Sequence, residues 1–232
     1  EDVYPTYLEV SFSNACNFAC AYCSPEISSG WMKDIQKDGV YPVKFGSHDL
    51  NYLKEVGKYP FKNSDPNPYV DAFWKWFPEA FKHLKVFRIT GGEPTMSKDF
   101  WKAVDYIVEH HHENPELKIG INSNLGTDPR LIERLIESVI RLESHGIDVE
   151  IFTSAESTGN KAEYARDGIV YDEWIVNIER MLTETNCRVV IMTTVNILSI
   201  SSMVEFVQDI MDLRIKFNQN LAHNRIPLSV NY

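Results

Sequence analysis

The feature that most constrains the fold is a regular alternation of apolar, β-branched runs with stretches of helical periodicity. Short apolar runs indicate strands, whereas apolar residues spaced by three and four positions indicate helices. Strands are predicted at residues 7–12, 84–89, 117–121, 148–152, 188–195 and 226–230. Strands and helices that alternate in this way predict a parallel sheet with right-handed crossovers. Six such units in 232 residues predict an α/β fold, a partial (β/α)6 TIM-like barrel.

Four helices are predicted between these strands from capping residues and apolar spacing. Ser97 is the expected N-cap of the first. Residues 128–145 form the second, with Asp128 at the cap, Pro129 in the first turn and Gly146 beyond the end. The last two are marked by apolar residues at helical spacing, namely Trp174, Ile178, Met181, Leu182, Val204, Val207, Ile210 and Met211.

Residues 24–69 interrupt the alternation. This segment contains five prolines and four glycines, and one short helix near residues 48–56 is the only element expected in it. A connection of this length in a compact domain is usually functional or mobile. The segment is therefore either a surface insertion without a role in chemistry or part of a substrate mouth, lined by aromatic residues such as Trp31, Tyr41 and Phe45.

Composition limits the class of function. The formal net charge of -10 argues against a nucleic-acid groove, because phosphate binding depends on a surplus of Lys and Arg. No apolar run approaches the ~20 residues that cross a bilayer, and the first residues lack the pattern of a signal peptide. A cytoplasmic protein that binds neither membrane nor nucleic acid is expected.

Three of the four cysteines, Cys16, Cys20 and Cys23, lie within eight residues. In a reducing compartment such a group more often binds metal than forms disulfides. Cys187 precedes the fifth strand, at the opposite end of the sheet from Cys16, so it is expected to be a buried core thiol rather than a fourth ligand. A cubane iron–sulfur cluster held by three thiolates keeps one iron open to a further ligand. From the motif alone, a zinc or disulfide protein remains an alternative.

Polar and small residues follow each of the first five strands. They are the three cysteines, Thr90 to Pro94 (TGGEP), Asn122 to Asn124 (NSN), Thr153 to Ser157 (TSAES) and Asn196. In parallel α/β folds the carboxyl ends of the strands meet at one edge, which carries the working residues. These segments are therefore expected to lie close together.

The Cys-x3-Cys-x2-Cys spacing, with Tyr22 before the last cysteine and GGEP about seventy residues later, resembles the signature of radical S-adenosylmethionine (radical SAM) enzymes. The resemblance extends over most of the chain and is strongest to the branch that carries C-terminal SPASM or twitch domains. It implies a 4Fe-4S cluster on Cys16, Cys20 and Cys23, whose open iron binds S-adenosyl-L-methionine. It also implies S-adenosylmethionine contacts, at Tyr22, Gly91, Gly92, Glu93, Asn122, Ser123, Ser154, Arg166 and Asn196. Glu156 stands where that branch usually has Asp.

The resemblance further implies an enzyme that reductively cleaves S-adenosylmethionine to a 5′-deoxyadenosyl radical, which abstracts hydrogen from a substrate. A one-electron donor of the flavodoxin or ferredoxin type, a peptide or small-molecule substrate, and a twitch-like or SPASM-like domain beyond Tyr232 are expected with it. The alternatives are a non-catalytic iron–sulfur or zinc protein with a structural or sensor role, and a module that binds the cofactor without turnover.

Overall fold

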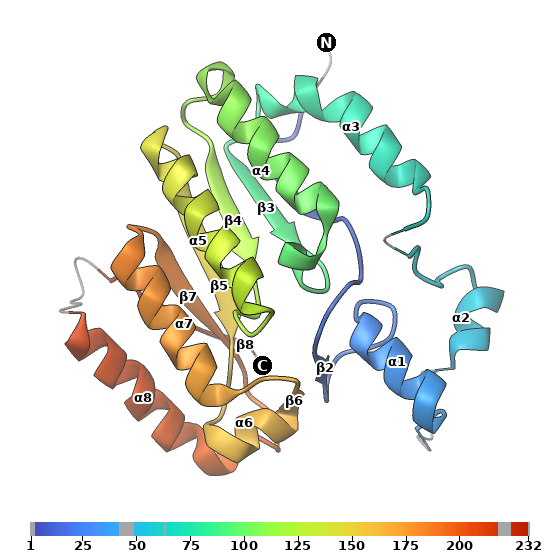
Figure 1. The fold of residues 1–232 in the computed structure, drawn as a ribbon, viewed down its shortest axis with the longest axis vertical. Coiled ribbons are helices and arrows are strands. Elements are labelled where there is room, and N and C mark those ends of the chain that lie inside the picture. The colour runs from blue at the N-terminus through green and yellow to red at the C-terminus, as the bar shows by residue number, and fades with distance from the viewer. Residues whose placement is uncertain (1–2, 42–48, 63, 218–223, 232) are drawn as a thin grey trace.

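The computed structural model describes residues 3–41, 49–62, 64–217 and 224–231 (Figure 1). A six-stranded sheet has the sequential order β1-β3-β4-β5-β7-β8, and all of its pairs are parallel. The expected α/β fold with six parallel strands is confirmed. The strands are β1 (Tyr7–Ser11), β3 (Val86–Thr90), β4 (Lys118–Asn122), β5 (Asp148–Ser154), β7 (Arg188–Thr194) and β8 (Leu228–Asn231).

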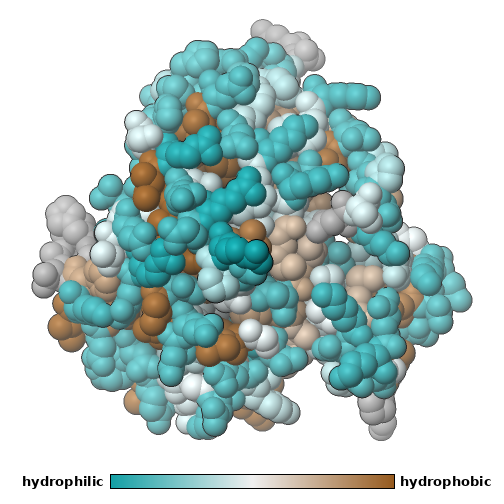
Figure 2. Space-filling model, viewed as in Figure 1, coloured by the Kyte–Doolittle hydropathy of each residue, from teal (hydrophilic) through white to brown (hydrophobic). Residues whose placement is uncertain are grey.

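The four predicted crossover helices are present and lie on one side of the sheet (Figure 1). They are α4 (Lys98–His110), α5 (Pro129–Ser144), α7 (Tyr171–Glu184) and α8 (Met203–Lys216). Both predicted N-caps form, because Ser97 accepts from the amide of Asp99 and Asp128 from the amide of Arg130. The exposed surface of these helices is mostly hydrophilic, with hydrophobic residues in separate patches (Figure 2). No helix among the described residues is long and apolar enough to cross a membrane.

The expectation of a single short helix in residues 24–69 is wrong. The predicted helix is present as α2 (Leu50–Glu55), but α1 (Ser29–Asp38) precedes it. A third helix, α3 (Pro68–Phe81), begins at the end of the segment. Helix α1 was missed because Trp31 and Ile35 are its only buried residues, too few for a clear periodic signal. Phe45 lies outside the described residues.

Alternate residues of the strands face opposite environments. On β3, Phe87 and Ile89 are fully buried against the helices, whereas Arg88 and Thr90 are half-buried on the other, inner face. The inner face is polar around Arg88, whose Nε donates to Oδ1 of Asn122 at 2.8 Å. This face and the carboxyl ends of the strands together define where a ligand can lie.

Two shorter elements and the C-terminal strand complete the sheet region. β2 (Ala19–Cys20) and β6 (Arg166–Asp167) form an antiparallel pair beside the carboxyl ends of the main strands (Figure 1). Strand β8 begins two residues later than predicted, and Ile226, just before it, is fully buried. Val230 is exposed.

Candidate active site

The three clustered cysteines lie in the loop that follows β1, here called the cysteine loop (residues 12–24). Cys16 is buried, whereas Cys20 and Cys23 are half-buried, and all three line one cavity of about 300 Å³. Burial, and to a smaller extent the neighbouring thiols, raises the pKa of Cys16 and Cys20 to about 11 and raises the pKa of Cys23. At neutral pH the three thiols are therefore protonated until a metal displaces their protons.

Helix α1 holds the backbone of the cysteine loop. The Ser28 hydroxyl donates to the carbonyl of Phe18 at 2.6 Å, and the indole of Trp31 donates to the carbonyl of Cys20 at 2.8 Å. Trp31 is 8% exposed. Trp31, one of the aromatic residues expected to line a substrate mouth, instead holds the backbone of Cys20. The first part of the insertion therefore supports the site.

The β2–β6 pair holds the same loop from the other side. Cys20 pairs with Arg166 in this ladder, and the amide of Ala21 donates to the carbonyl of Ala165 at 2.8 Å. Gly168 has a φ of +106°, and a side chain there would lie 2.8 Å from an atom of the Phe18 ring. The sequence does not predict this pair, because two-residue strands carry no periodic signal.

The glycines of TGGEP pack against the cysteine loop. The amides of Gly92 and Glu93 donate to the carbonyls of Ser13 and Ala15, at 3.2 and 2.6 Å. A Cβ on Gly92 would lie 2.3 Å from the oxygen of Ala15, so glycine is needed there for the loop itself. Among the described residues, the carbonyls of Gly91 and Gly92 accept no hydrogen bond. Both glycines line the cavity, where these carbonyls can accept from a ligand.

Glu93 is buried and does not line the cavity. Its carboxylate accepts from the amide and hydroxyl of Thr95, from the hydroxyl of Ser123 and from the amide of Asn124, at 2.7 to 3.1 Å. Burial raises its pKa, and these four donors oppose the shift by favouring the ionised form. Glu93 therefore joins the TGGEP segment to the loop after β4.

The last residue of β4, Asn122, and the first two residues of the loop after it, Ser123 and Asn124, line the cavity. Asn124 was not predicted as a site residue, although it belongs to the NSN triplet. Its Nδ2 lies 4.0 Å from Sγ of Cys16 and donates to Oδ1 of Asn17 at 2.9 Å. The side chain thus contacts the cysteine loop directly.

Arg166 and Glu156 are buried and form a hydrogen-bonded network with Tyr22, which is partly exposed. Its Nε and Nη2 donate to Oε2 of Glu156 at 3.1 and 2.8 Å, and the Tyr22 hydroxyl donates to Oε1 at 2.7 Å. The guanidinium carbon lies 5.1 Å from the centre of the Tyr22 ring. Arg166 and Tyr22 line the cavity together with Ser154, and Glu156 lies behind them.

Asn196 is not brought to the cavity. Its Nδ2 donates to the carbonyl of Thr194 and its Oδ1 accepts from the amide of Leu198, both at 2.9 Å. These bonds form the turn after β7. Thr194 lines the cavity in its place.

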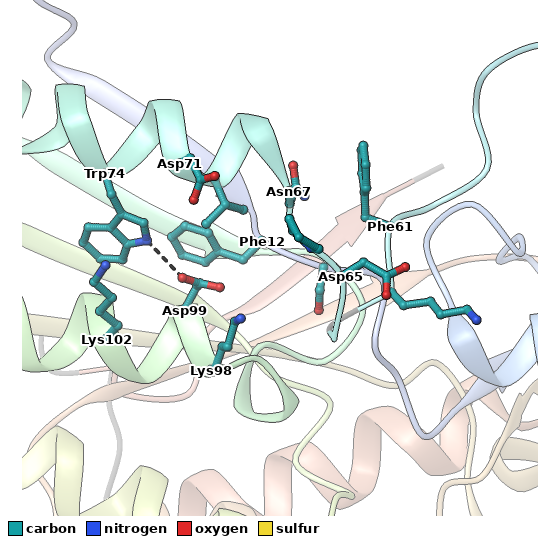
Figure 3. Close-up of a pocket in the computed structure, with 13 residues that line it drawn as sticks. Phe12, Phe61, Asp65, Asn67, Asp71, Trp74, Lys98, Asp99 and Lys102 are labelled. Carbon is teal, nitrogen blue, oxygen red and sulfur yellow. Dashed lines mark hydrogen bonds between the residues drawn. The ribbon is translucent and has the colours of Figure 1, made fainter.

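A larger cavity, of about 430 Å³, lies between α3 and α4 (Figure 3). Phe12 and Trp74 form its apolar part, and the indole of Trp74 donates to Asp99 at 2.9 Å. The ammonium of Lys102 lies 4.0 Å from the centre of the Trp74 ring. None of the cysteines lines this cavity, so we place the chemistry at the smaller cavity.

The donor set of the smaller cavity fits a cubane cluster. Within the described part of the chain, no three His, Cys, Asp or Glu side chains are arranged to hold one metal ion. A cubane has no such requirement, because each thiolate binds a different iron. Three thiols around one cavity, with a cation and two carbonyls on its walls, suit a cluster and a charged ligand beside it.

The described structure is similar to solved proteins over nearly its whole length. SuiB of Streptococcus suis bound to the precursor peptide SuiA aligns with a TM-score of 0.58 and 15% sequence identity, covering 98% of this chain and 39% of that chain. At this identity the likeness supports the fold alone.

Curated relatives match a shorter region. GTP 3′,8-cyclase of Mannheimia succiniciproducens is 31% identical over 101 residues, which are 44% of this chain and 21% of the relative. GTP 3′,8-cyclase of Haemophilus ducreyi is 33% identical over 104 residues, again 44% of this chain and 22% of the relative. The matched region therefore spans about a fifth of the length of these relatives.

The family model of the Radical SAM superfamily matches residues 10–210. This range covers β3, β4, β5 and β7 completely and the last two residues of β1. It also contains every residue of the cysteine loop. The chain therefore belongs to the radical SAM superfamily, whose members are enzymes that use a 4Fe-4S cluster and S-adenosylmethionine.

Proposed function

We propose that this domain, with a 4Fe-4S cluster bound, reductively cleaves S-adenosylmethionine to methionine and a 5′-deoxyadenosyl radical that abstracts hydrogen from a substrate. The observation that carries the proposal is the arrangement of the three thiols and the two glycine carbonyls around one cavity. The cluster, when bound, supplies the electron for this cleavage. Cys16, Cys20 and Cys23 would hold it.

The walls of the cavity have suitable groups for S-adenosylmethionine. The carbonyls of Gly91 and Gly92 can accept from the ammonium of its methionine part, while Arg166 offers a cation for its carboxylate. Asn122, Ser123 and Ser154 add polar groups, and Tyr22 a ring, around the remaining volume. Glu93 does not line the cavity, but its carboxylate accepts hydrogen bonds from Ser123 and Asn124 and so holds the loops that carry these residues.

The substrate is proposed to be a peptide or a small molecule. SuiB was solved with a precursor peptide, and the curated relatives are GTP 3′,8-cyclases by name. A one-electron donor of the flavodoxin or ferredoxin type is also proposed, since cluster reduction needs one. The four unpaired cysteines are in keeping with a reducing, cytoplasmic location. A twitch-like or SPASM-like domain following Tyr232 stays a prediction.

Anaerobic reconstitution with iron and sulfide tests the proposal. We expect a brown protein with charge-transfer absorption near ~400 nm, which binds S-adenosylmethionine and forms 5′-deoxyadenosine after reduction with dithionite. The matched control is the variant with Cys16, Cys20 and Cys23 replaced by alanine, which should form neither. A colourless protein with stoichiometric zinc would refute the proposal, and a cluster that binds S-adenosylmethionine without any cleavage would reduce the domain to a binding module.

A further inference from the structure

The third guanidinium nitrogen of Arg166 points at a cluster ligand. Nε and Nη2 are both bound to Glu156, whereas Nη1 lies 4.0 Å from Sγ of Cys20. Hydrogen bonds to sulfur are longer than those to oxygen because the sulfur atom is larger. The geometry is therefore that of an N–H donor directed at the sulfur.

The surroundings of Arg166 leave its side chain little freedom. Glu156 is fully buried, and it is held in turn by the Tyr22 hydroxyl at 2.7 Å. The Tyr22 ring lies beneath the guanidinium, and the ladder between β2 and β6 fixes the backbones of Arg166 and Cys20 opposite each other. Two independent constraints, one on the side chain and one on the backbone, thus direct Nη1 toward Cys20.

The three cysteines differ in the donors around them. Cys16 has neutral donors, the amide of Phe18 at 3.4 Å and Nδ2 of Asn124 at 4.0 Å. Cys23 contacts the carbonyl of Ser24, which is an acceptor. Among the described residues that line the cavity, Arg166 is the only Lys, Arg or His. The one cationic side chain that lines the cavity, which is paired with Glu156 behind it, therefore lies on the Cys20 side.

We propose that Arg166 is a positioning residue that donates from Nη1 to the Cys20 thiolate and thereby raises the reduction potential of the cluster. This inference rests on the proposed function, because it requires the cluster to be bound. A one-electron reduction adds a negative charge to the cluster, and a nearby cation with an N–H directed at a ligand sulfur stabilises that charge. Half-buried surroundings strengthen the effect relative to water.

The test is an EPR-monitored redox titration of the reconstituted full chain, with titanium citrate as the reductant and without S-adenosylmethionine. For Arg166→Gln we expect the equilibrium constant for reduction to fall about tenfold, which is about 59 mV for a one-electron couple. For Arg166→Lys we expect a fall as well, because its single ammonium pairs with Glu156 and no second donor reaches Cys20. Arg141→Gln is the matched control, since it removes the same charge from an exposed ion pair between Arg141 on α5 and Asp105 on α4.

The outcomes separate this inference from the proposed function. A wild-type protein without a cluster refutes the proposed function. If the wild type binds a cluster and Arg166→Gln has the same reduction potential, the role of Arg166 is overturned. If the reduction potential falls in Arg166→Gln but not in Arg166→Lys, the donor contact is overturned and only a charge effect is left. If Arg166→Gln does not retain iron, Arg166→Lys decides: a lowered potential supports the contact, and an unchanged potential overturns it.

Discussion

Replacing Gly92 by alanine is expected to displace the cysteine loop and lower its capacity for iron. The new Cβ would lie 2.3 Å from the oxygen of Ala15 and 2.7 Å from the carbonyl carbon of Asn14, whereas ordinary contacts begin at 3.4 Å. These are backbone atoms, so they cannot rotate away as a side chain can. Relief requires a shift of the loop next to Cys16.

The magnitude follows from the same contacts. Gly92 does not have a positive φ, so the cost is steric rather than conformational. Overpacking of this kind costs about 1–3 kcal/mol, and weakening the bond from the Glu93 amide to the Ala15 carbonyl, 2.6 Å in the native structure, adds about 1 kcal/mol. A total of about 2–4 kcal/mol lowers the Tm of a domain of this size by roughly 4–16 °C.

Thermal melting of the apo-protein and iron content after reconstitution measure the two effects. Gly120→Ala is the control, because a Cβ there would meet side-chain atoms of Phe152 and Arg88 at 3.1 and 3.2 Å, which can adjust. If Gly92 serves only to let S-adenosylmethionine approach, Gly92→Ala will keep a full cluster and lose only cofactor affinity. That result, with a Tm within about a degree of the wild type, would refute the reasoning.

Three further outcomes are expected. Single alanine variants of the three cysteines of the loop should lose iron, whereas Cys187→Ala should retain it, as judged by visible absorption after reconstitution. Loss of iron from a folded Cys187→Ala protein would contradict the assignment of Cys187 as a core thiol. In the apo-protein, the rate of alkylation of Cys16 and Cys20 by iodoacetamide should rise with a midpoint near pH 11, because burial raises both pKa values to about 11. The folded protein should lose stability as the pH rises from about 9 to 11, since the thiols then ionise in the unfolded chain first. An alkylation midpoint near an ordinary thiol pKa would show that the loop is open to water. Glu156→Ala should lower the free energy of unfolding in urea by about 3–5 kcal/mol, because the buried guanidinium of Arg166 loses its partner. Asp105→Ala, which breaks an ion pair on the surface, should change this free energy little. Equal effects would indicate that the buried pair is solvated.

Much of the scaffold followed from the sequence. The apolar periodicity of the strands and the caps at Ser97 and Asp128 are local signals, and the structure confirms both. The rim of polar segments after successive strands was predictable as well, because parallel strands bring their carboxyl ends to one edge. Cys187 was correctly separated from the other thiols, since a strand of known rise lies between them and it is buried at the far end.

The arrangement within the site was decided by tertiary contacts. The ladder between Cys20 and Arg166 joins positions 146 residues apart, and the bonds of Trp31 and Ser28 to the cysteine loop come from a helix with only two buried residues. Such contacts involve single residues and leave no period in the sequence.

The same reason explains what each motif residue does. The sequence showed that Gly92 and Glu93 stand together after a strand. Only the folded chain shows that Gly92 accommodates the cysteine loop and that Glu93 joins the TGGEP segment to the loop after β4. Residue type and spacing determined which chemistry is possible, because thiolates, carbonyls and a guanidinium bind particular partners. The packing of loops against one another determined which atoms face the cavity, since that depends on distances between residues far apart in the chain.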